Sequence, residues 1–446
     1  MDMTFIAVIT LGLLVFIAHV LEGLFARTKI PDVLILLFIG IFLGPITGLV
    51  TPEHLGKVAP VFTTLTLIII LFEGGLGLNL KTLGKSLVGA TGLTVWSFFA
   101  TLAVLAPLCH TFLGMNWLQS FTLATTVAGT SSAMVIPVVK RLALGEKTKT
   151  ILTLESALSD VLTLVVVLAL VEAQVNGSFS INQIFSGVFT SFLIAAVIGG
   201  LAGMCWSLAL HWLHSRGLKK SIFTTPAFVM VIYGLVGSLG FSGVIAALMV
   251  GITLGNIQAL PPAFLRKRRD LLESPNETEV AVFEEVAFLL KTLFFVYVGT
   301  SIQFTSPSII LISLIITAAL FLLRIPVIRI SLIPRSAFSR FEASISGAMN
   351  PKGLAAAVAA LIPLQTFQEI LKRKDLSPEE LLLAQNGLLA GQKIQETVFI
   401  VILFTIVVSS MLFFLIERGW FKRVAKVLYH GYPDGSEGNK ETETGE

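Results

Sequence analysis

Long apolar runs alternate with short polar segments along the whole chain. A transmembrane helix needs about 20 predominantly apolar residues, and about 13 runs approach that length. We predict transmembrane helices over residues 5–22, 30–50, 61–80, 86–109, 117–139, 151–171, 181–210, 221–239, 242–257, 280–302, 308–333, 343–363 and 398–417. The pattern therefore predicts an all-α polytopic membrane protein.

The composition agrees with this prediction and excludes a soluble globular protein. Of the 446 residues, 55% are hydrophobic and only 13% are charged, whereas soluble domains average about 45–50% apolar and about 25% charged residues. Cys109 and Cys205 lie far apart in apolar runs and do not have the spacing of metal ligands. We expect both to be small buried hydrophobes, and we expect no cofactor.

The basic residues predict the orientation in the membrane. Most of the 31 lysines and arginines fall in alternate loops and after the last span, and such an excess marks the cytoplasmic side. We therefore place the N-terminus outside the cell membrane and the C-terminus in the cytoplasm. The same distribution argues against a nucleic-acid-binding surface.

We predict a single transmembrane domain over residues 1–425, followed by a short polar cytoplasmic tail over 426–446 that is disordered. The mixed-charge stretch 365–393 is expected to contain an outside amphipathic helix after Ser377 and Pro378.

Charged residues inside the predicted spans mark function or an essential pairing, because charge in a bilayer is costly. The sixth span contains both Glu155 and Asp160. At about 100° per residue the two acids point about 140° apart, so we expect different roles: one faces an ion cavity and the other a partner helix. A helix cap is the alternative for Asp160. Arg324 needs a buried carboxylate, and Glu155 is the natural candidate.

Two spans are predicted to be interrupted. Residues 125–137 form a hydroxyl-rich stretch that includes Thr130 and Ser131, and residues 350–353 read Asn-Pro-Lys-Gly. The first stretch suits either oxygen ligands for an alkali cation or close helix packing. The second breaks a helix and places Lys352 at the break, with an inside-loop lysine as the alternative. One broken span in each half points to a transporter with inverted repeats.

Several alternatives remain open from the residues alone. Glu73 either adds a second acid to an ion site or pairs with Lys291. A passive cation channel remains possible, as does a carrier of a small organic anion bound by Lys352, Arg324 and Lys291. The six histidines form neither a metal cluster nor a clear dyad with a buried serine, so we expect no enzyme active site.

Taken in order, these segments resemble the sodium/proton exchanger superfamily of monovalent cation:proton antiporters, especially its bacterial and archaeal NhaP-like branch. The resemblance covers nearly the whole chain. It rests on Glu155-x-x-x-Ser159-Asp160, the interrupted fifth span, Arg324 in the eleventh span, Lys352-Gly353 in the twelfth, and the segments 41–45 and 71–75.

The resemblance implies an NhaA-like antiporter fold, in which inverted six-helix repeats make the fifth and twelfth spans cross at their unwound middles. Helices 3–6 and 10–13 would form a core, or transport, part. Helices 1–2 and 7–9 would form a dimerisation part, and the protein would be a homodimer in the bilayer.

The resemblance also implies exchange of Na⁺, Li⁺ or K⁺ for H⁺ by alternating access, with the two ions competing for Asp160. Glu155 would hold Arg324 structurally, and Lys352 would be the charge at the helix break. Further oxygens of the alkali-cation site would come from Ser156, Ser159, Thr130, Ser131 and Glu73. A single acid combined with an arginine in the eleventh span favours the electroneutral branch. That branch usually has Asn where this chain has Ser159, and Arg where it has Lys352.

Overall fold

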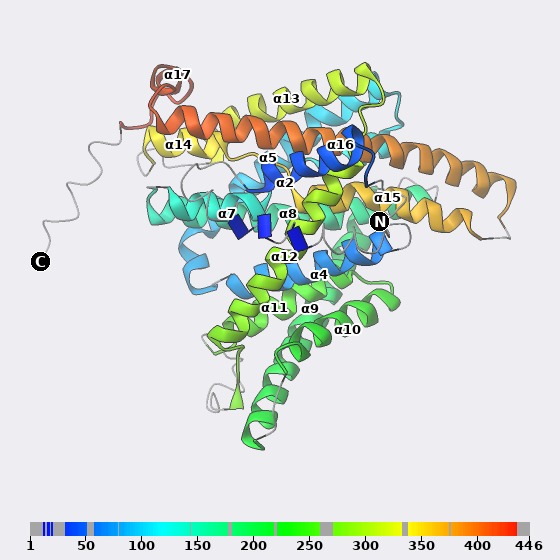
Figure 1. Ribbon diagram of the computed structural model, residues 1–446, viewed down its shortest axis with the longest axis vertical. Coiled ribbons are helices and arrows are strands. Elements are labelled where there is room, and N and C mark those ends of the chain that lie inside the picture. Colours follow the sequence, from blue (N-terminus) through cyan, green and yellow to red (C-terminus); the bar gives the residue numbers. More distant parts are fainter. Residues whose placement is uncertain are drawn as a thin grey trace, which may run out of the picture. The chain divides into compact units, whose positions relative to one another are not determined.

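A computed structural model describes residues 12–13, 16–17, 19–20, 32–50, 58–78, 80–142, 144–176, 181–217, 221–258, 271–331, 338–373 and 376–434. The regular elements within these ranges are helices (Figure 1). Most of the first predicted span lies outside the described residues.

Six of the described helices contain a stretch long and apolar enough to cross a membrane. They are α5 (Leu80–Leu113), α8 (Glu146–Val175), α9 (Ile181–Ser215), α13 (Pro307–Ser331), α15 (Leu354–Leu371) and α16 (Pro378–Glu417). Shorter apolar helices are α2 (Asp32–Ile41), which continues into the π-helix η1 (Phe42–Ile46), α10 (Thr224–Ser238) and α11 (Gly243–Asn256), together with the apolar part of α4 (Val58–Gly77). The prediction of an all-helical, multi-pass membrane protein is confirmed.

The chain divides into two compact units. Unit 1 comprises Met1–Val15, Thr51–Gly84 and Ser180–Tyr297, and unit 2 comprises Phe16–Val50, Lys85–Phe179 and Val298–Glu446. The sequence predicted one transmembrane domain with transport and dimerisation parts. Which unit plays which part stays a prediction.

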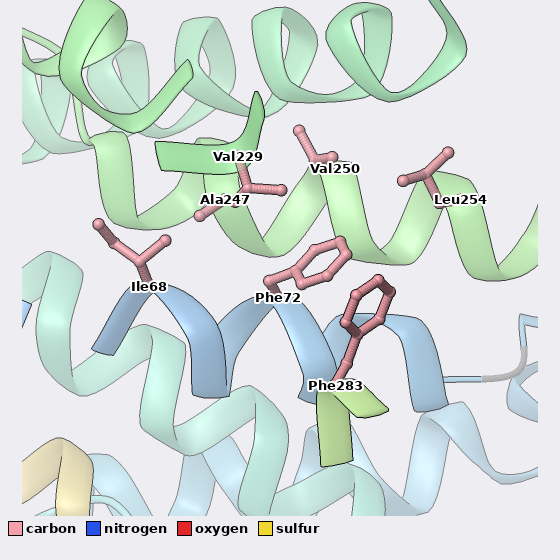
Figure 2. Close-up of a cluster of buried hydrophobic side chains, with 7 residues drawn as sticks. All are labelled: Ile68, Phe72, Val229, Ala247, Val250, Leu254 and Phe283. Atoms are coloured by element: carbon pink, nitrogen blue, oxygen red, sulfur yellow. The ribbon is translucent and has the colours of Figure 1, made fainter. Parts of the chain in front are cut away.

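In unit 1, α11 packs against both α4 and α9. Phe72 of α4 meets Phe283 of α12 (Glu277–Ser301) edge to face, with ring centroids 5.6 Å apart. The buried cluster around these rings is drawn in Figure 2 and comprises Ile68, Phe72, Val229, Ala247, Val250, Leu254 and Phe283. The two helices α4 and α11 come close at Gly75, because glycine has no side chain there. A Cβ added at Gly75 would lie only 2.6 Å from the Leu248 carbonyl oxygen. Small residues permit such close backbone approach in membranes.

In unit 2, α8 packs against both interrupted segments. The first segment is α6 (Trp117–Thr126) followed by α7 (Ser132–Arg141), and the second is α14 (Arg340–Ala348) followed by α15. The backbone leaves helical geometry between the two halves of each segment. Since α8 carries Glu155 and Asp160, this packing brings the acids to the interruptions.

The helix predicted after Ser377 and Pro378 is present, and it is continuous with the last predicted span. One helix, α16, begins at Pro378 and runs without a break to Glu417. Its start matches the prediction, because Ser377 and Glu380 form a capping box. The helix does not stop before the apolar run, because Gly387 and Gly391 pack closely against α15 instead of ending a turn.

The predicted disordered tail begins too early. Residues Lys422–Leu428 form the helix α17, and the chain after it packs against the rest of unit 2. The rings of Tyr429 and Tyr432 are both buried, and the Tyr432 hydroxyl donates a hydrogen bond to the Ile328 carbonyl oxygen at 3.3 Å. Burial of these two aromatic rings fixes the segment. Residues 435–446 lie outside the described residues.

Candidate functional site

The two interruptions meet each other. The Ser131 N–H donates a hydrogen bond to the Pro351 carbonyl oxygen at 2.9 Å, and the Lys352 Nζ donates to the Gly129 carbonyl oxygen at 2.9 Å. Interrupting a helix leaves backbone groups without partners, which a membrane protein must satisfy internally. Here each interruption satisfies part of the other, through one backbone bond and one bond from the Lys352 side chain. The place where the two interruptions meet is called the crossing below.

Helix α16 supplies further partners for the second interruption. The Lys352 N–H donates to the Thr405 Oγ1 at 3.0 Å, and the Ser409 Oγ donates to the Ala348 carbonyl oxygen at 2.9 Å. Both side chains are buried on α16. The long helix therefore acts as a fixed support behind the crossing.

Glu155 and Arg324 form a buried, two-pronged ion pair. The Arg324 Nη1 lies 2.5 Å from the Glu155 Oε1, and the Nη2 lies 2.7 Å from the Oε2. The Arg324 Nε donates to the Ser346 carbonyl oxygen at 3.1 Å, and the Nη1 also reaches the Ser97 Oγ at 3.3 Å. Each side chain is about 1% exposed or less. The pair joins α8 and α13 to α14 and α5.

Asp160 has different surroundings from Glu155. Its Oδ2 accepts hydrogen bonds from the Ser132 Oγ at 2.6 Å and the Ser132 N–H at 3.2 Å. Ser132 is the first residue of α7, so the carboxylate lies at a helix N-terminus, where negative charge is stabilised. Asp160 is 7% exposed, and it has no ion-pair partner among the described residues.

Of the predicted hydroxyl ligands, only Thr130 bonds to an acid within the described residues, and that acid is Glu155. The Thr130 Oγ1 donates to the Glu155 Oε1 at 3.3 Å. The Thr130 N–H donates to the Ser159 Oγ at 3.0 Å, and that hydroxyl donates to the Ser156 carbonyl oxygen at 3.1 Å. The Thr130 hydroxyl thus lies on the carboxylate of the ion pair, whereas the sequence placed it with Asp160.

The other two predicted hydroxyl ligands, Ser156 and Ser131, make no hydrogen bond to Asp160. The Ser156 Oγ donates to the Thr153 carbonyl oxygen of its own helix at 2.9 Å. The Ser131 Oγ is buried and has no hydrogen-bond partner within the described part of the chain. An unpartnered buried hydroxyl is costly, so Ser131 has capacity to bind a further group at the crossing.

Lys352 is buried at the crossing, with only 1% of its surface exposed. Its Nζ donates to the Gly129 carbonyl oxygen and, at 2.7 Å, to the Asn350 Oδ1. The Asn350 Nδ2 in turn donates to the Leu320 carbonyl oxygen at 3.0 Å. The alternative of an inside-loop lysine is therefore excluded.

Sequence reasoning missed Ser132 and Asn350 as members of the site. Ser132 stood in the hydroxyl-rich stretch, but periodicity cannot show which hydroxyl faces Asp160 once the helix is interrupted. Asn350 stood in the helix break, where only Lys352 was singled out. Glu73 lies on α4 in unit 1 and Lys291 on α12 in the same unit; their roles stay predictions.

The crossing combines a carboxylate, hydroxyls and backbone carbonyls in one polar centre inside a membrane protein. Oxygen atoms of these kinds are the ligands that hard cations prefer. A carboxylate can also carry a proton. The centre therefore has the chemistry to hold either a small cation or a proton at Asp160.

Comparison with known proteins identifies relatives of the chain. Residues 12–418 match the family model described as "Sodium/hydrogen exchanger, transmembrane". The chain is 27% identical over 258 residues to the K(+)/H(+) antiporter NhaP2 of Shewanella baltica, a stretch that covers 55% of this chain and 43% of NhaP2. The chain thus matches less than half the length of that relative.

A second relative matches along more of its length. The low-affinity Na(+)/H(+) antiporter NhaS1 of Synechocystis is 25% identical over 399 residues, which cover 86% of this chain and 68% of NhaS1. Among solved structures, the sodium proton antiporter MjNhaP1 of Methanocaldococcus jannaschii at pH 8 aligns with a TM-score of 0.72 and 21% identity, covering 96% of this chain and 100% of that one. The alignment shows a shared fold.

Proposed function

Because the chain belongs to the sodium/hydrogen exchanger family of membrane transporters, we propose that it exchanges a monovalent cation for protons by alternating access. The exchanger family consists of transporters, so the chain is not an enzyme. Two relatives, named as K(+)/H(+) and Na(+)/H(+) antiporters, support K⁺ or Na⁺ as the cation, and Li⁺ stays a prediction.

The observation that carries the proposal is the difference between the two acids of α8. Glu155 is satisfied by the Arg324 guanidinium and is 1% exposed. Asp160 is 7% exposed, and its carboxylate accepts hydrogen bonds from Ser132 alone among the described residues. An ionised carboxylate without a paired cation in a membrane is costly. Asp160 is therefore the group whose charge an arriving ion would neutralise.

The mechanism follows from that charge. A bound cation or a bound proton neutralises Asp160 equally, so the two compete for one position. The loaded site crosses the membrane barrier, because it carries less uncompensated charge than the empty, ionised site. Since the empty site is held back, cation movement in one direction is coupled to proton movement in the other.

Other residues at the crossing have supporting roles in this proposal. Ser132 orients the Asp160 carboxylate, and the unpartnered Ser131 hydroxyl adds an oxygen ligand. The remaining predicted cation ligands stay predictions, because the site would have to rearrange before they could reach a cation at Asp160: Ser156, Ser159, Thr130 and Glu73. Lys352 supplies positive charge where the broken helices meet, and Glu155 with Arg324 holds the surrounding helices.

In the proposed architecture, thirteen spans form inverted repeats, the protein is a homodimer in the cell membrane, and its C-terminus is cytoplasmic. A single exchanging acid supports electroneutral exchange of one cation for one proton, because the charge of Arg324 is already neutralised by Glu155.

The decisive variant is Asp160→Asn, which keeps the shape of the side chain but cannot ionise. Purified protein is reconstituted into vesicles with an internal pH dye and challenged with Na⁺, K⁺ or Li⁺, with and without a clamped voltage. We expect the variant to lose at least about 100-fold in exchange rate while eluting as a folded protein, because it removes the only ionisable group that the two ions share.

Glu172→Gln is the matched control, since Glu172 lies exposed on the same helix. It should exchange like the wild type. Wild-type rates in Asp160→Asn vesicles would reject the role of Asp160. A sodium flux that proceeds without moving protons would instead indicate a channel, and a voltage-dependent exchange rate would reject electroneutrality.

A further inference from the structure

A second polar feature of unit 2 lies away from the crossing, where α14, α16 and α17 meet at one end of α16 (Figure 1). A cavity of about 520 Å³ opens there. The charged side chains that line it are Arg340, Lys422, Arg423, Lys426 and Asp434. Four of these five follow residue 418, beyond the segment that matches the exchanger family model.

The positive charge of this cavity is largely uncompensated. Its only lining acid, Asp434, pairs with the Arg340 Nη1. Lys422, Arg423 and Lys426 are exposed, and none has an ion-pair or hydrogen-bond partner in the described parts of the chain. Three cations therefore face the cavity without a counter-charge from those parts.

Arg340 gives the cavity a fixed wall. Its backbone N–H donates to the Pro433 carbonyl oxygen at 2.8 Å, and its side-chain Nη2 donates to the Tyr432 carbonyl oxygen at 3.1 Å. These bonds, together with the pair to Asp434, hold the Arg340 side chain in place.

The surroundings indicate where that anion comes from. Trp420 is 68% exposed, Val424 46% and Val427 74%, so apolar side chains stand beside the free cations. The cavity also contacts Ile416, at the end of the apolar helix α16. A short helix with basic and apolar residues next to the end of a span is typical of a segment lying at the membrane surface.

We propose that this cavity binds the phosphate group of an anionic phospholipid from the leaflet that α17 touches. Lys422, Arg423 and Lys426 bind the phosphate oxygens, and the apolar residues of α17 and α16 contact the acyl chains. Basic pockets at the cytoplasmic ends of spans bind such head groups in other membrane proteins. The inference does not depend on the proposed transport activity.

The test measures lipid retention by the full-length chain in detergent, using native mass spectrometry. Dioleoyl phosphatidylglycerol is the anionic probe and dioleoyl phosphatidylcholine the neutral one. We expect the wild type to retain phosphatidylglycerol preferentially. Lys422→Gln combined with Lys426→Gln should weaken retention by about tenfold or more, because two of the charges near the head group are lost. Both side chains are exposed, so the variant should fold.

Lys147→Gln combined with Lys149→Gln is the matched control. It removes two lysines from another segment predicted to be cytoplasmic, where Lys147 stacks over Phe338 and Lys149 pairs with Glu146. It should retain lipid like the wild type. Equal retention by wild type and by the pocket variant would overturn the proposal.

Inorganic phosphate distinguishes the two sources of a phosphate group. In a thermal-unfolding measurement it is added in place of lipid to wild type and to the Lys422→Gln, Lys426→Gln variant. If phosphate stabilises only the wild type while phosphatidylglycerol is not retained, the membrane source is overturned in favour of a soluble phosphate compound. A lipid-dependent shift that phosphate does not reproduce supports the phospholipid.

Discussion

Breaking the buried pair between Glu155 and Arg324 should destabilise unit 2 far more than breaking any exposed pair of the same chemistry. The change is Glu155→Gln or Arg324→Met. Each variant leaves the other member of the pair buried and charged without its partner. In the native pair the two N–O distances of 2.5 Å and 2.7 Å show that both hydrogen bonds are formed.

The expected magnitude follows from burial. Removing one member of a buried pair costs about 3–5 kcal/mol, because the remaining charge keeps its desolvation penalty. Removing Arg324 also leaves the Ser346 carbonyl oxygen without its donor, so this variant should lie at the upper end. Replacing both members, by Glu155→Gln with Arg324→Met, should cost clearly less than the sum of the singles, because no charge is left unpaired.

The assay is thermal unfolding of purified protein in detergent, followed by intrinsic fluorescence and by recovery on size exclusion. A loss of this size corresponds to roughly 5–10 °C in the apparent Tm. Glu146→Gln is the control on the same helix. The Glu146 side chain is 87% exposed and pairs with Lys149 at 3.0 Å, and exposed pairs contribute about 0–1 kcal/mol.

Two outcomes would refute the reasoning. Single variants that unfold within about 1 °C of the wild type would show that the pair does not hold the helices. A double variant as unstable as the two singles combined would show that the side chains act independently, and not through a shared charge interaction.

Two further predictions concern the hydrogen bonds around the site. Ser132→Ala should raise the half-saturating cation concentration for exchange about tenfold, because Asp160 loses a 2.6 Å bond and bonds to charged groups contribute about 1.5–3 kcal/mol; an unchanged value in the vesicle assay contradicts the assigned contact. Glu342 precedes the predicted span 343–363: burial raises the pKa of its carboxyl, but bonds from Ser339, Thr148 and Gly145 outweigh burial and hold the pKa below 4.5. The carboxylate thus stabilises the folded state above about pH 4.5, and this contribution is lost as the pH falls through the lowered pKa. Glu342→Gln should cost about 1 kcal/mol at pH 7, allowing for partial exposure, with the Tm difference closing as the pH falls through the lowered pKa; a gap that persists in acid would exclude the carboxylate as its source.

The fold class could be predicted because each span is recognisable from its own local sequence. A run of apolar residues has few ways to avoid water other than as a membrane helix, and backbone hydrogen bonding inside lipid requires the helix. The separate roles of Glu155 and Asp160 followed for a similar reason. Their angular separation on one helix is fixed by 3.6 residues per turn, so two directions were certain before any neighbour was known.

The helix interruptions limited prediction within the site. Between Thr126 and Ser132 the chain leaves helical geometry, so the angular phase of α7 relative to α6 is not set by residue spacing. The sequence therefore marked Thr130 and Ser131 as ligands for Asp160, whereas the structure gives that contact to Ser132. The same loss of phase explains why Asn350 was overlooked beside Lys352.

The sequence alone determined that this protein crosses the membrane many times, that two spans are interrupted, and that Asp160 and Glu155 face apart. These properties depend on local hydropathy, helix-breaking residues and the fixed turn of a helix. Only the tertiary structure decided that the interruptions bond to each other, that Thr130 serves Glu155, and that the segment before residue 435 closes a basic cavity over Arg340. Such contacts join residues that are far apart in the chain, and their free energy depends on how the helices pack.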